Sequence, residues 1–466
     1  MNSSPSGASS LSSKEVNSDL FDQSALSSLA QRLVEAAKRA GADAADAVAV
    51  RGISQGVEVR DGRVEESERS EGDDVGLRVL VGQRQAVVST NDVSGDGAVR
   101  LAERAVAMAR VAPVDKYVGL ADPALLARDF PDLDLLDPRI PSVAELEHRA
   151  QQAEAAALAV KGVTKSGGAS ASAGIGGMVL VTSDGFHGSY LRSSQGISMT
   201  AISGEGTGME RDYDYTAAPH GADLKSPEEV GRLAGERTVA RSNPRKVETC
   251  NVPVVFDPRV SGSLVGHLVG AINGASIARK TSFLKDRLGA QLFSKNIRII
   301  DDPLRRRGLR SQSFDAEGVK VKKLAIIDQG VLTSWLLDSA TARELGLVTT
   351  GHAHRGVSSS PSPGPYNLYM EAGEPTPTEL IADIKQGFYV TDLIGSGVNG
   401  VTGDYSRGAS GFWIENGKMT YPVSEVTIAG HLLEIFKSLT PANNLEFRYG
   451  VDAPTVRIEG LTLGGR

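Results

Sequence analysis

The chain of 466 residues is longer than one hydrophobic core usually serves, so we expect two or three domains. Its 50 Lys and Arg residues are outnumbered by 57 Asp and Glu residues, and the net charge of −7 argues against nucleic-acid binding. The single cysteine, Cys250, excludes an intrachain disulfide framework and fits a reducing compartment. Because no apolar run is long enough for a membrane span and the N-terminus lacks a signal-peptide core, we expect a cytoplasmic protein without membrane anchoring.

The first part of the chain predicts a flexible tail followed by a small mixed domain. Residues 1–21 are rich in serine and form the predicted tail, and residues 22–125 form the predicted N-terminal α+β domain. Helical spacing of leucine and alanine predicts helices at 22–40 and 97–111. Between them, Asp61-Gly62 is typical of a tight hairpin turn because both positions tolerate positive φ. The predicted antiparallel strands are 48–51, 56–60, 64–70, 75–81 and 85–89.

Residues 140–244 are predicted to form a small α+β middle domain after a proline-punctuated connector. Ser142 and Glu145 form a capping box that opens a helix to about residue 160. A second helix, from Ser226 to about Ser242, follows four strand-like segments. These predicted strands are 169–173, 177–182, 186–193 and 197–203.

Residues 250–466 are predicted to form a β-rich C-terminal domain, which makes the whole chain an α+β protein. Gln329-Gly330 and Asn416-Gly417 lie between apolar runs and predict two hairpins. A short helix is expected at Thr376, a last long helix from Val423 to Leu439, and strands at 252–256 and 455–461.

One unusual segment, residues 260–288, has helical periodicity but a composition that disfavours helix. Four glycines recur at every fourth residue, and each costs roughly 1 kcal/mol of helix propensity relative to alanine. On a helix they lie on one face, which favours either close packing against another element or subunit, or a former active-site helix. The candidate residues for a peptide cleft or close packing are Gly262, Gly266, His267, Gly270, Asn273 and Gly274.

Other motifs carry weaker signals. The glycine-rich run at 395–400 continues into a turn-rich segment and not into the helix that a dinucleotide site needs. Ser54 lies in a Gly-x-Ser-x-Gly match that joins two strands, unlike a nucleophile elbow. His352 and His354 could share a strand face and bind metal, although neighbouring glycines favour a loop. The basic run at 305–307 is expected to be a solvated loop or a subunit contact.

Two stretches are specific enough to resemble a known family. VTDLIGSGVNGVTGDYSRGASGFWIENGKMTYPVSEVTIAG at 390–430 and GASIARKTSFLKDRLG at 274–289 closely resemble the PmbA (TldE) branch of the TldD/PmbA family, and residues 76–92 resemble its N-terminal domain. The resemblance implies a cytoplasmic metallopeptidase system for unfolded or leader-like peptides. In that system a TldD-type subunit carries zinc on a His-Glu-x-x-x-His helix with a later cysteine, and a TldE-type partner completes the assembly.

This chain departs from the catalytic pattern of that family. Alignment on GASIARKTSFL places Val265, Gly266 and Gly270 where the first His, the Glu and the second His would stand, and Cys250 precedes the helix. The resemblance therefore implies a noncatalytic partner subunit with no catalytic or metal-binding residues and no cofactor of its own. Zinc is expected in a TldD-type partner, with unfolded peptides as substrates and a possible homodimer when the chain is alone. The alternatives are an independent metallopeptidase with an unrecognised site, for example at His352 and His354, and a peptide-binding or modulator protein without hydrolysis.

Overall fold

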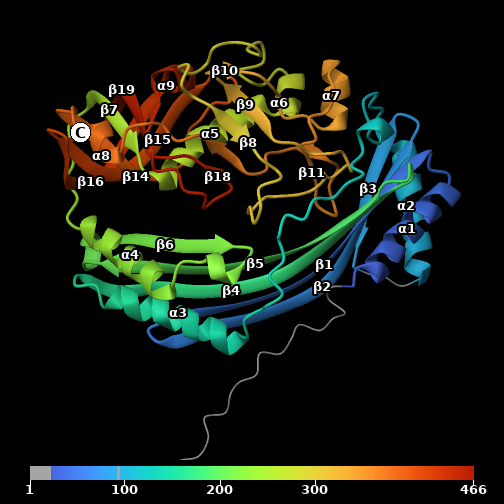
Figure 1. The fold of residues 1–466 in the computed structure, drawn as a ribbon, viewed down its shortest axis with the longest axis horizontal. Coiled ribbons are helices and arrows are strands. Elements are labelled where there is room, and N and C mark those ends of the chain that lie inside the picture. The colour runs from blue at the N-terminus through green and yellow to red at the C-terminus, as the bar shows by residue number, and fades with distance from the viewer. Residues whose placement is uncertain (1–21, 92–94) are drawn as a thin grey trace, which may run out of the picture.

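The protein has two stacked halves (Figure 1). The structure, a computed structural model, describes residues 22–91 and 95–466, so the predicted tail at 1–21 lies outside the described residues. A long curved antiparallel sheet from the first half of the chain lies beneath a C-terminal half with its own sheets (Figure 1). This mixed architecture confirms the predicted α+β class. No helix in the described ranges is long and apolar enough to cross a membrane.

The lower half is a single six-stranded sheet of order β3-β2-β1-β4-β5-β6. Its central strand β1 pairs with β2 on one side and with β4 on the other, so the two predicted N-terminal domains share one sheet. The strands are longer than predicted because glycine and serine on one face weaken the apolar alternation on which strand prediction depends. Their bounds are β1 Ala44–Arg60, β2 Arg63–Val81, β3 Arg84–Thr90, β4 Val163–Thr182, β5 His187–Ser203 and β6 Glu210–Ala218.

Two pairs of helices cover the lower face of this sheet at its two ends (Figure 1). They are α1 Ser24–Arg39 and α2 Gly95–Val111 at one end, and α3 Val143–Leu158 and α4 Pro227–Ala240 at the other. All four were predicted, and α3 begins with the predicted capping box of Ser142 and Glu145. Each pair buries an alanine- and valine-rich face of the sheet in its own hydrophobic cluster.

The upper half packs a six-stranded sheet and a five-stranded sheet around one large apolar core, which includes the inner face of helix α5. The first sheet has the order β16-β15-β14-β7-β19-β17 and the second β10-β9-β8-β13-β18, and β11 and β12 form a separate pair. The strands are β7 Cys250–Phe256, β8 Ile299–Asp301, β9 Leu324–Asp328, β10 Val331–Leu332, β11 Ala353–His354, β12 Ser362–Pro363, β13 Leu368–Met370, β14 Gln386–Ile394, β15 Asp404–Glu415, β16 Lys418–His431, β17 Thr440–Pro441, β18 Val451–Asp452 and β19 Val456–Gly464. The helices are α5 Pro258–Ile272, α6 Gly274–Ala278, α7 Ser339–Leu345, α8 Pro377–Ile381 and α9 Leu432–Ser438.

The predicted tight turns are confirmed. Asp61, Gln329 and Asn416 have φ of 52°, 47° and 49°, and the glycine after each is also positive. Two positive φ angles in succession match the right-handed twist of paired strands, and residues with a larger side chain rarely adopt them.

One helix prediction was wrong, and another gave a helix that is too long. Residues 423–431 belong to strand β16 and only Leu432–Ser438 is helical, because a bulge at Glu425, with φ of 55°, breaks the alternation that would have indicated a strand. The predicted helix 260–288 ends at Ile272. Asn273 is extended there, with φ of −63° and ψ of 123°, and its side chain accepts a hydrogen bond from Ala275 N to begin α6.

The two halves meet at one end of the lower sheet through backbone contact and a buried ion pair. An added Cβ on Gly76 would lie 1.8 Å from Val357 O, so the upper half rests directly on this glycine. Nearby, Asp46 accepts hydrogen bonds from both Arg78 and Arg355. Burial alone would raise the pKa of Asp46, but the two guanidinium groups hold it below its ordinary value.

At the other end of the sheet, arginines of the upper half bind carboxylates of β6. Arg259 lies 2.7 Å from Asp212, and Arg448 lies 3.0 Å from Asp214. Arg306 and Arg307 bind Asp134 in the connector, at 3.0 and 2.6 Å. The basic run expected to be solvated or to contact a subunit therefore makes an intrachain contact.

We expect Gly76→Ala to destabilise the protein by at least about 2 kcal/mol, because its Cβ would overlap backbone atoms of residue 357 that cannot rotate away. Gly72→Ala, on the same strand, should be neutral or slightly stabilising, since nothing lies within 4 Å of an added Cβ there. Urea unfolding of both variants measures the difference. Equal stabilities would show that the upper half does not rest on Gly76.

Candidate functional site

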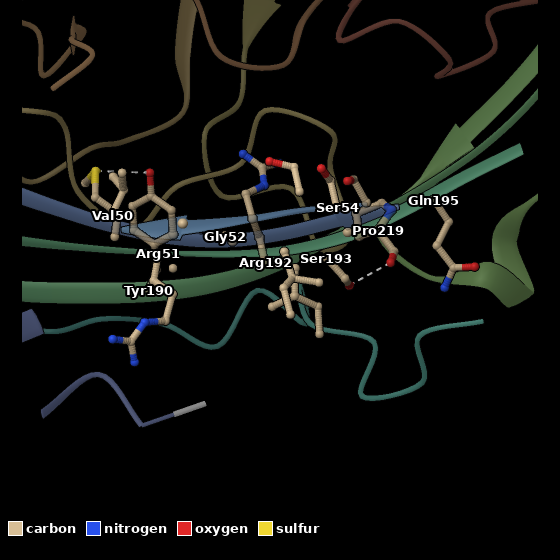
Figure 2. A pocket seen from close by; sticks show the side chains of 18 of the residues that line it. Val50, Arg51, Gly52, Ser54, Tyr190, Arg192, Ser193, Gln195 and Pro219 are labelled. Carbon is tan, nitrogen blue, oxygen red and sulfur yellow. Dashed lines mark hydrogen bonds between the residues drawn. The ribbon is translucent and has the colours of Figure 1, made fainter. Parts of the chain in front are cut away.

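A cleft of about 750 Å³ lies between the two halves (Figure 2). Its floor is the upper face of β1, β2, β4 and β5, and Leu309 and Arg355 of the upper half also line it. Val50, Met178 and Tyr190 at one end of the cleft pack against the apolar cluster that joins the halves. The cleft therefore begins where that cluster ends.

Three glycines form the centre of the floor. Gly52 is the direct partner of Gly72 on one side and of Gly176 on the other, which places one glycine on each of β2, β1 and β4. An added Cβ on Gly72 meets nothing within 4 Å, and on Gly52 and Gly176 it meets only a carbonyl oxygen of the adjacent strand, at 3.8 and 3.9 Å. No atom of the upper half lies within 4 Å of an added Cβ on these three residues, which we call the glycine floor.

The next row across the sheet carries hydroxyl groups. Ser70, Ser54, Gly174 and Ser194 are consecutive partners on β2, β1, β4 and β5, and the three serines are exposed. Figure 2 shows Ser54 beside Gly52 on this floor. Ser54 lies within a continuous strand, far from the strand-to-helix turn that a nucleophilic serine needs.

Charged groups stand at the two sides of the cleft. Arg192 on β5 is the partner of Gly176 and donates a hydrogen bond to Leu309 O. Within residues 22–91 and 95–466, Arg192 makes no ion pair, and burial lowers the pKa of its guanidinium. Asp74, on β2 at the opposite side, is exposed and makes no ion pair in the same ranges.

The glycines predicted on one helix face divide into two groups. An added Cβ on Gly262 would lie 2.7 Å from Val451 O, and one on Gly274 would lie 2.8 Å from Leu336 O. Gly266 and Gly270 are exposed, with nothing within 4 Å. Close packing within the chain therefore explains Gly262 and Gly274 but not Gly266 and Gly270. Asn273 caps α6 and donates to Pro363 O at 2.8 Å.

His267 lies half-buried on α5, next to Tyr405 of β15. Their ring centroids are 5.8 Å apart in an edge-on arrangement. His267 Nε2 and Tyr405 Oη are both buried without a hydrogen-bond partner. Burial, together with the nearby Arg407, lowers the pKa of His267 to about 4, so the ring is neutral at pH 7.

The two close-set histidines do not form a metal site. His352 is buried, with Nδ1 facing Thr350 O at 2.9 Å and Nε2 3.2 Å from Asp301. His354 packs against Tyr366, with ring centroids 4.6 Å apart, and burial lowers its pKa to about 4. In the described part of the chain, no group of three or more His, Cys, Asp or Glu residues is placed to hold a metal ion. Among the described residues, His352 and His354 therefore lack the third ligand that a catalytic zinc needs.

Comparison with known proteins matches the chain over nearly its whole length. The PmbA/TldA metallopeptidase domain 1 matches residues 45–109, the central domain 136–242 and the C-terminal domain 249–465. Metalloprotease PmbA of Escherichia coli O157:H7 is 40% identical over 418 residues, covering 89% of this chain and 90% of that protein. The chain belongs to the PmbA branch of the TldD/PmbA family. A PmbA homolog of Haemophilus influenzae is 37% identical over 436 residues, covering 93% of this chain and 94% of the homolog.

Solved structures share the fold of this PmbA-family chain. A Bacteroides thetaiotaomicron protein described as a modulator of DNA gyrase superimposes with a TM-score of 0.87 at 27% identity, covering 94% of this chain and 98% of that one. TldE from Thermococcus kodakarensis gives a TM-score of 0.83 at 19% identity, covering 94% of this chain and 100% of that one, and supports the fold alone.

The sequence prediction missed the cleft of this PmbA-family chain completely. The candidate residues all came from 262–274, whereas the glycine floor and Arg192 come from strands of the first half. Gly52 lies nine residues before the predicted turn at Asp61-Gly62, and Gly72 lies ten residues after it. Extending the register of Arg60 and Arg63 would have paired Gly52 with Glu71, and the pairing with Gly72 arises only from a β-bulge between Glu58 and Val59, which the turn alone does not reveal.

Gly266→Ala should stabilise the isolated chain by about 1 kcal/mol, because alanine favours helix and nothing obstructs its methyl group. Gly274→Ala should be destabilising, since its methyl group would contact Leu336 O at 2.8 Å. Chemical denaturation of the two variants tests this division. A destabilised Gly266→Ala chain would reveal intrachain packing at that position.

The neutral state of His267 predicts a pH-dependent stability. Its folded pKa of about 4 lies below the unfolded value near 6.5, so stability falls as pH drops from 6.5 towards 4, where only the unfolded state takes up the proton. His267→Gln should therefore lose less stability than the wild type between pH 7 and pH 5. Urea unfolding at both pH values measures this, with exposed His148→Gln as the control. Part of the fall should remain, because His354 has a similar pKa. An unchanged pH dependence in His267→Gln would contradict the burial of the ring.

Proposed function

We propose that this chain is the noncatalytic PmbA/TldE-type subunit of a cytoplasmic TldD/TldE metallopeptidase that acts on unfolded or leader-like peptides. The exposed face of α5 carries the observation on which this rests. Gly266 and Gly270 occupy it and have no side chain that could bind a metal or transfer a proton. A hydrolytic zinc needs about three protein ligands and usually a carboxylate as general base.

The third aligned position supports the same conclusion. Val265 is 1% exposed and belongs to the core of the upper half, so a ligand there would require repacking. Cys250 begins β7, and burial raises the pKa of its thiol, which disfavours the thiolate that binds zinc. We therefore assign the zinc and the general base to a TldD-type partner. This chain contributes surfaces that hold the peptide and complete the assembly.

The alternative of an independent peptidase at His352 and His354 has less support. His352 Nε2 lies 3.2 Å from Asp301 in the core without a hydrogen bond, and Asp301 accepts the backbone N–H of Tyr366. Zinc binding there would require a third ligand that the described residues do not place nearby. A peptide-binding protein without hydrolysis differs from our proposal only in lacking the catalytic partner.

The test compares the purified chain with and without a TldD-type protein from the same organism. The chain alone should contain no stoichiometric zinc and should cleave no unfolded peptide, and the mixture should elute as one complex with zinc-dependent activity. Metal analysis, size-exclusion chromatography and a peptidase assay give the three measurements. His352→Ala should change neither metal content nor activity in the mixture. One zinc per isolated chain, lost together with activity in His352→Ala, would contradict the proposal, and failure of the two proteins to associate would favour the binding-protein alternative.

A further inference from the structure

The cleft carries a cation without a counter-ion. Arg192 lines it, and within residues 22–91 and 95–466 its guanidinium donates a hydrogen bond only to the neutral carbonyl of Leu309. A partly buried guanidinium without a carboxylate is costly, because the low-dielectric surroundings do not replace its lost hydration. A bound anionic group would relieve this cost and form charge-assisted hydrogen bonds.

A second arginine of the same cleft also has unused donors. Arg355 is fully buried and lines the cleft together with Tyr190, which lies two residues before Arg192 on the same strand face. Its Nη1 binds Asp46, but Nε and Nη2 are buried without hydrogen-bond partners. Asp46 is also shared with Arg78, so one carboxylate accepts hydrogen bonds from two guanidinium groups. The free donors of Arg355 are therefore a second place in the cleft where an anionic group can accept hydrogen bonds.

The side of the cleft opposite Arg192 carries a negative charge. Asp74 on β2 and Arg192 on β5 are separated by the two strands β1 and β4. Three interstrand spacings of about 4.8 Å across the sheet and an offset of two residues along the strands place their Cα atoms roughly 16 Å apart. Between them lies the glycine floor, where a ligand can approach the strand backbones closely. An extended peptide of about five residues, at about 3.3 Å per residue, spans this distance.

We infer that this cleft binds a short extended peptide, with its free C-terminal carboxylate on Arg192 and its N-terminal ammonium group towards Asp74. The inference deepens the proposed function by naming the substrate class: short peptides with free ends, as a peptidase would release or trim. The glycine floor accommodates the main chain, and the exposed hydroxyls of Ser54, Ser70 and Ser194 offer hydrogen bonds that do not depend on the side chains of the peptide.

Binding is measured on the isolated full chain by isothermal titration with three alanine-based pentapeptides. One has a free C-terminus, one is amidated, and one is amidated but carries a terminal glutamate side chain. The free acid should bind at least tenfold more tightly than the plain amide, and the difference should shrink with added salt. Tight binding of the glutamate amide alone would place a side-chain carboxylate in the site and overturn the C-terminal assignment.

Arg192→Gln should weaken binding of the free acid at least tenfold and remove the preference for acid over amide. Arg104→Gln, which removes an exposed charge from α2 below the sheet, is the matched control and should bind as the wild type does. Gly52→Val should block binding without lowering stability, since its side chain would project into open space. Melting curves of all variants separate lost binding from lost folding.

Equal binding of acid and amide by the wild type, or an unaffected Arg192→Gln chain, would overturn the inference, as would the absence of binding at millimolar peptide. These outcomes concern binding by the isolated chain, whereas the proposed function is tested by the activity of the mixture. The inference and the proposed function can therefore fail separately.

Discussion

Buried carboxylates of the lower sheet hold the upper half in place, and the rest of the arrangement depends on them. Asp46 binds Arg355 at one end of the sheet, and Asp212 and Asp214 bind Arg259 and Arg448 at the other. Removing one member of such a pair would leave an unpaired buried charge, which typically costs about 3–5 kcal/mol. The halves are joined at both ends of the long strands. Over the middle of the sheet, the upper half leaves a cleft. The cleft is a consequence of this two-point attachment.

Glycine has two opposite functions in this chain, and only tertiary contacts distinguish them. Gly76 and Gly72 face the same way on β2, yet the first is pressed against residue 357 and the second faces open space. The same division occurs on α5, where Gly262 touches the backbone of β18 and Gly266 touches nothing. A glycine pattern in the sequence therefore indicates either close contact with another part of the chain or an open space. The pattern alone does not distinguish the two.

Local features of the fold could be predicted from the sequence, whereas features that depend on distant pairing could not. The turns at Asp61-Gly62 and Asn416-Gly417 and the capped helix at Ser142 each depend on a few adjacent residues. The cleft depends on β1 pairing with both β2 and β4, which brings together Gly72 and Gly176 from segments about a hundred residues apart. The bulge at Glu425 was equally hidden, because an inserted residue shifts apolar positions into a spacing that resembles a helix.

The glycines of the cleft floor lower the free energy of unfolding, and this cost indicates what the cleft is for. Each glycine in a strand interior costs about 0.5–1 kcal/mol relative to alanine, so the three residues of the glycine floor together cost about 2 kcal/mol. An alanine methyl group would fit at each of the three positions without steric conflict. Net stabilities of folded proteins are only about 5–15 kcal/mol, so this cost is not negligible. A floor that stays bare at this cost is better explained by a cleft that must admit a ligand than by chance loss of side chains.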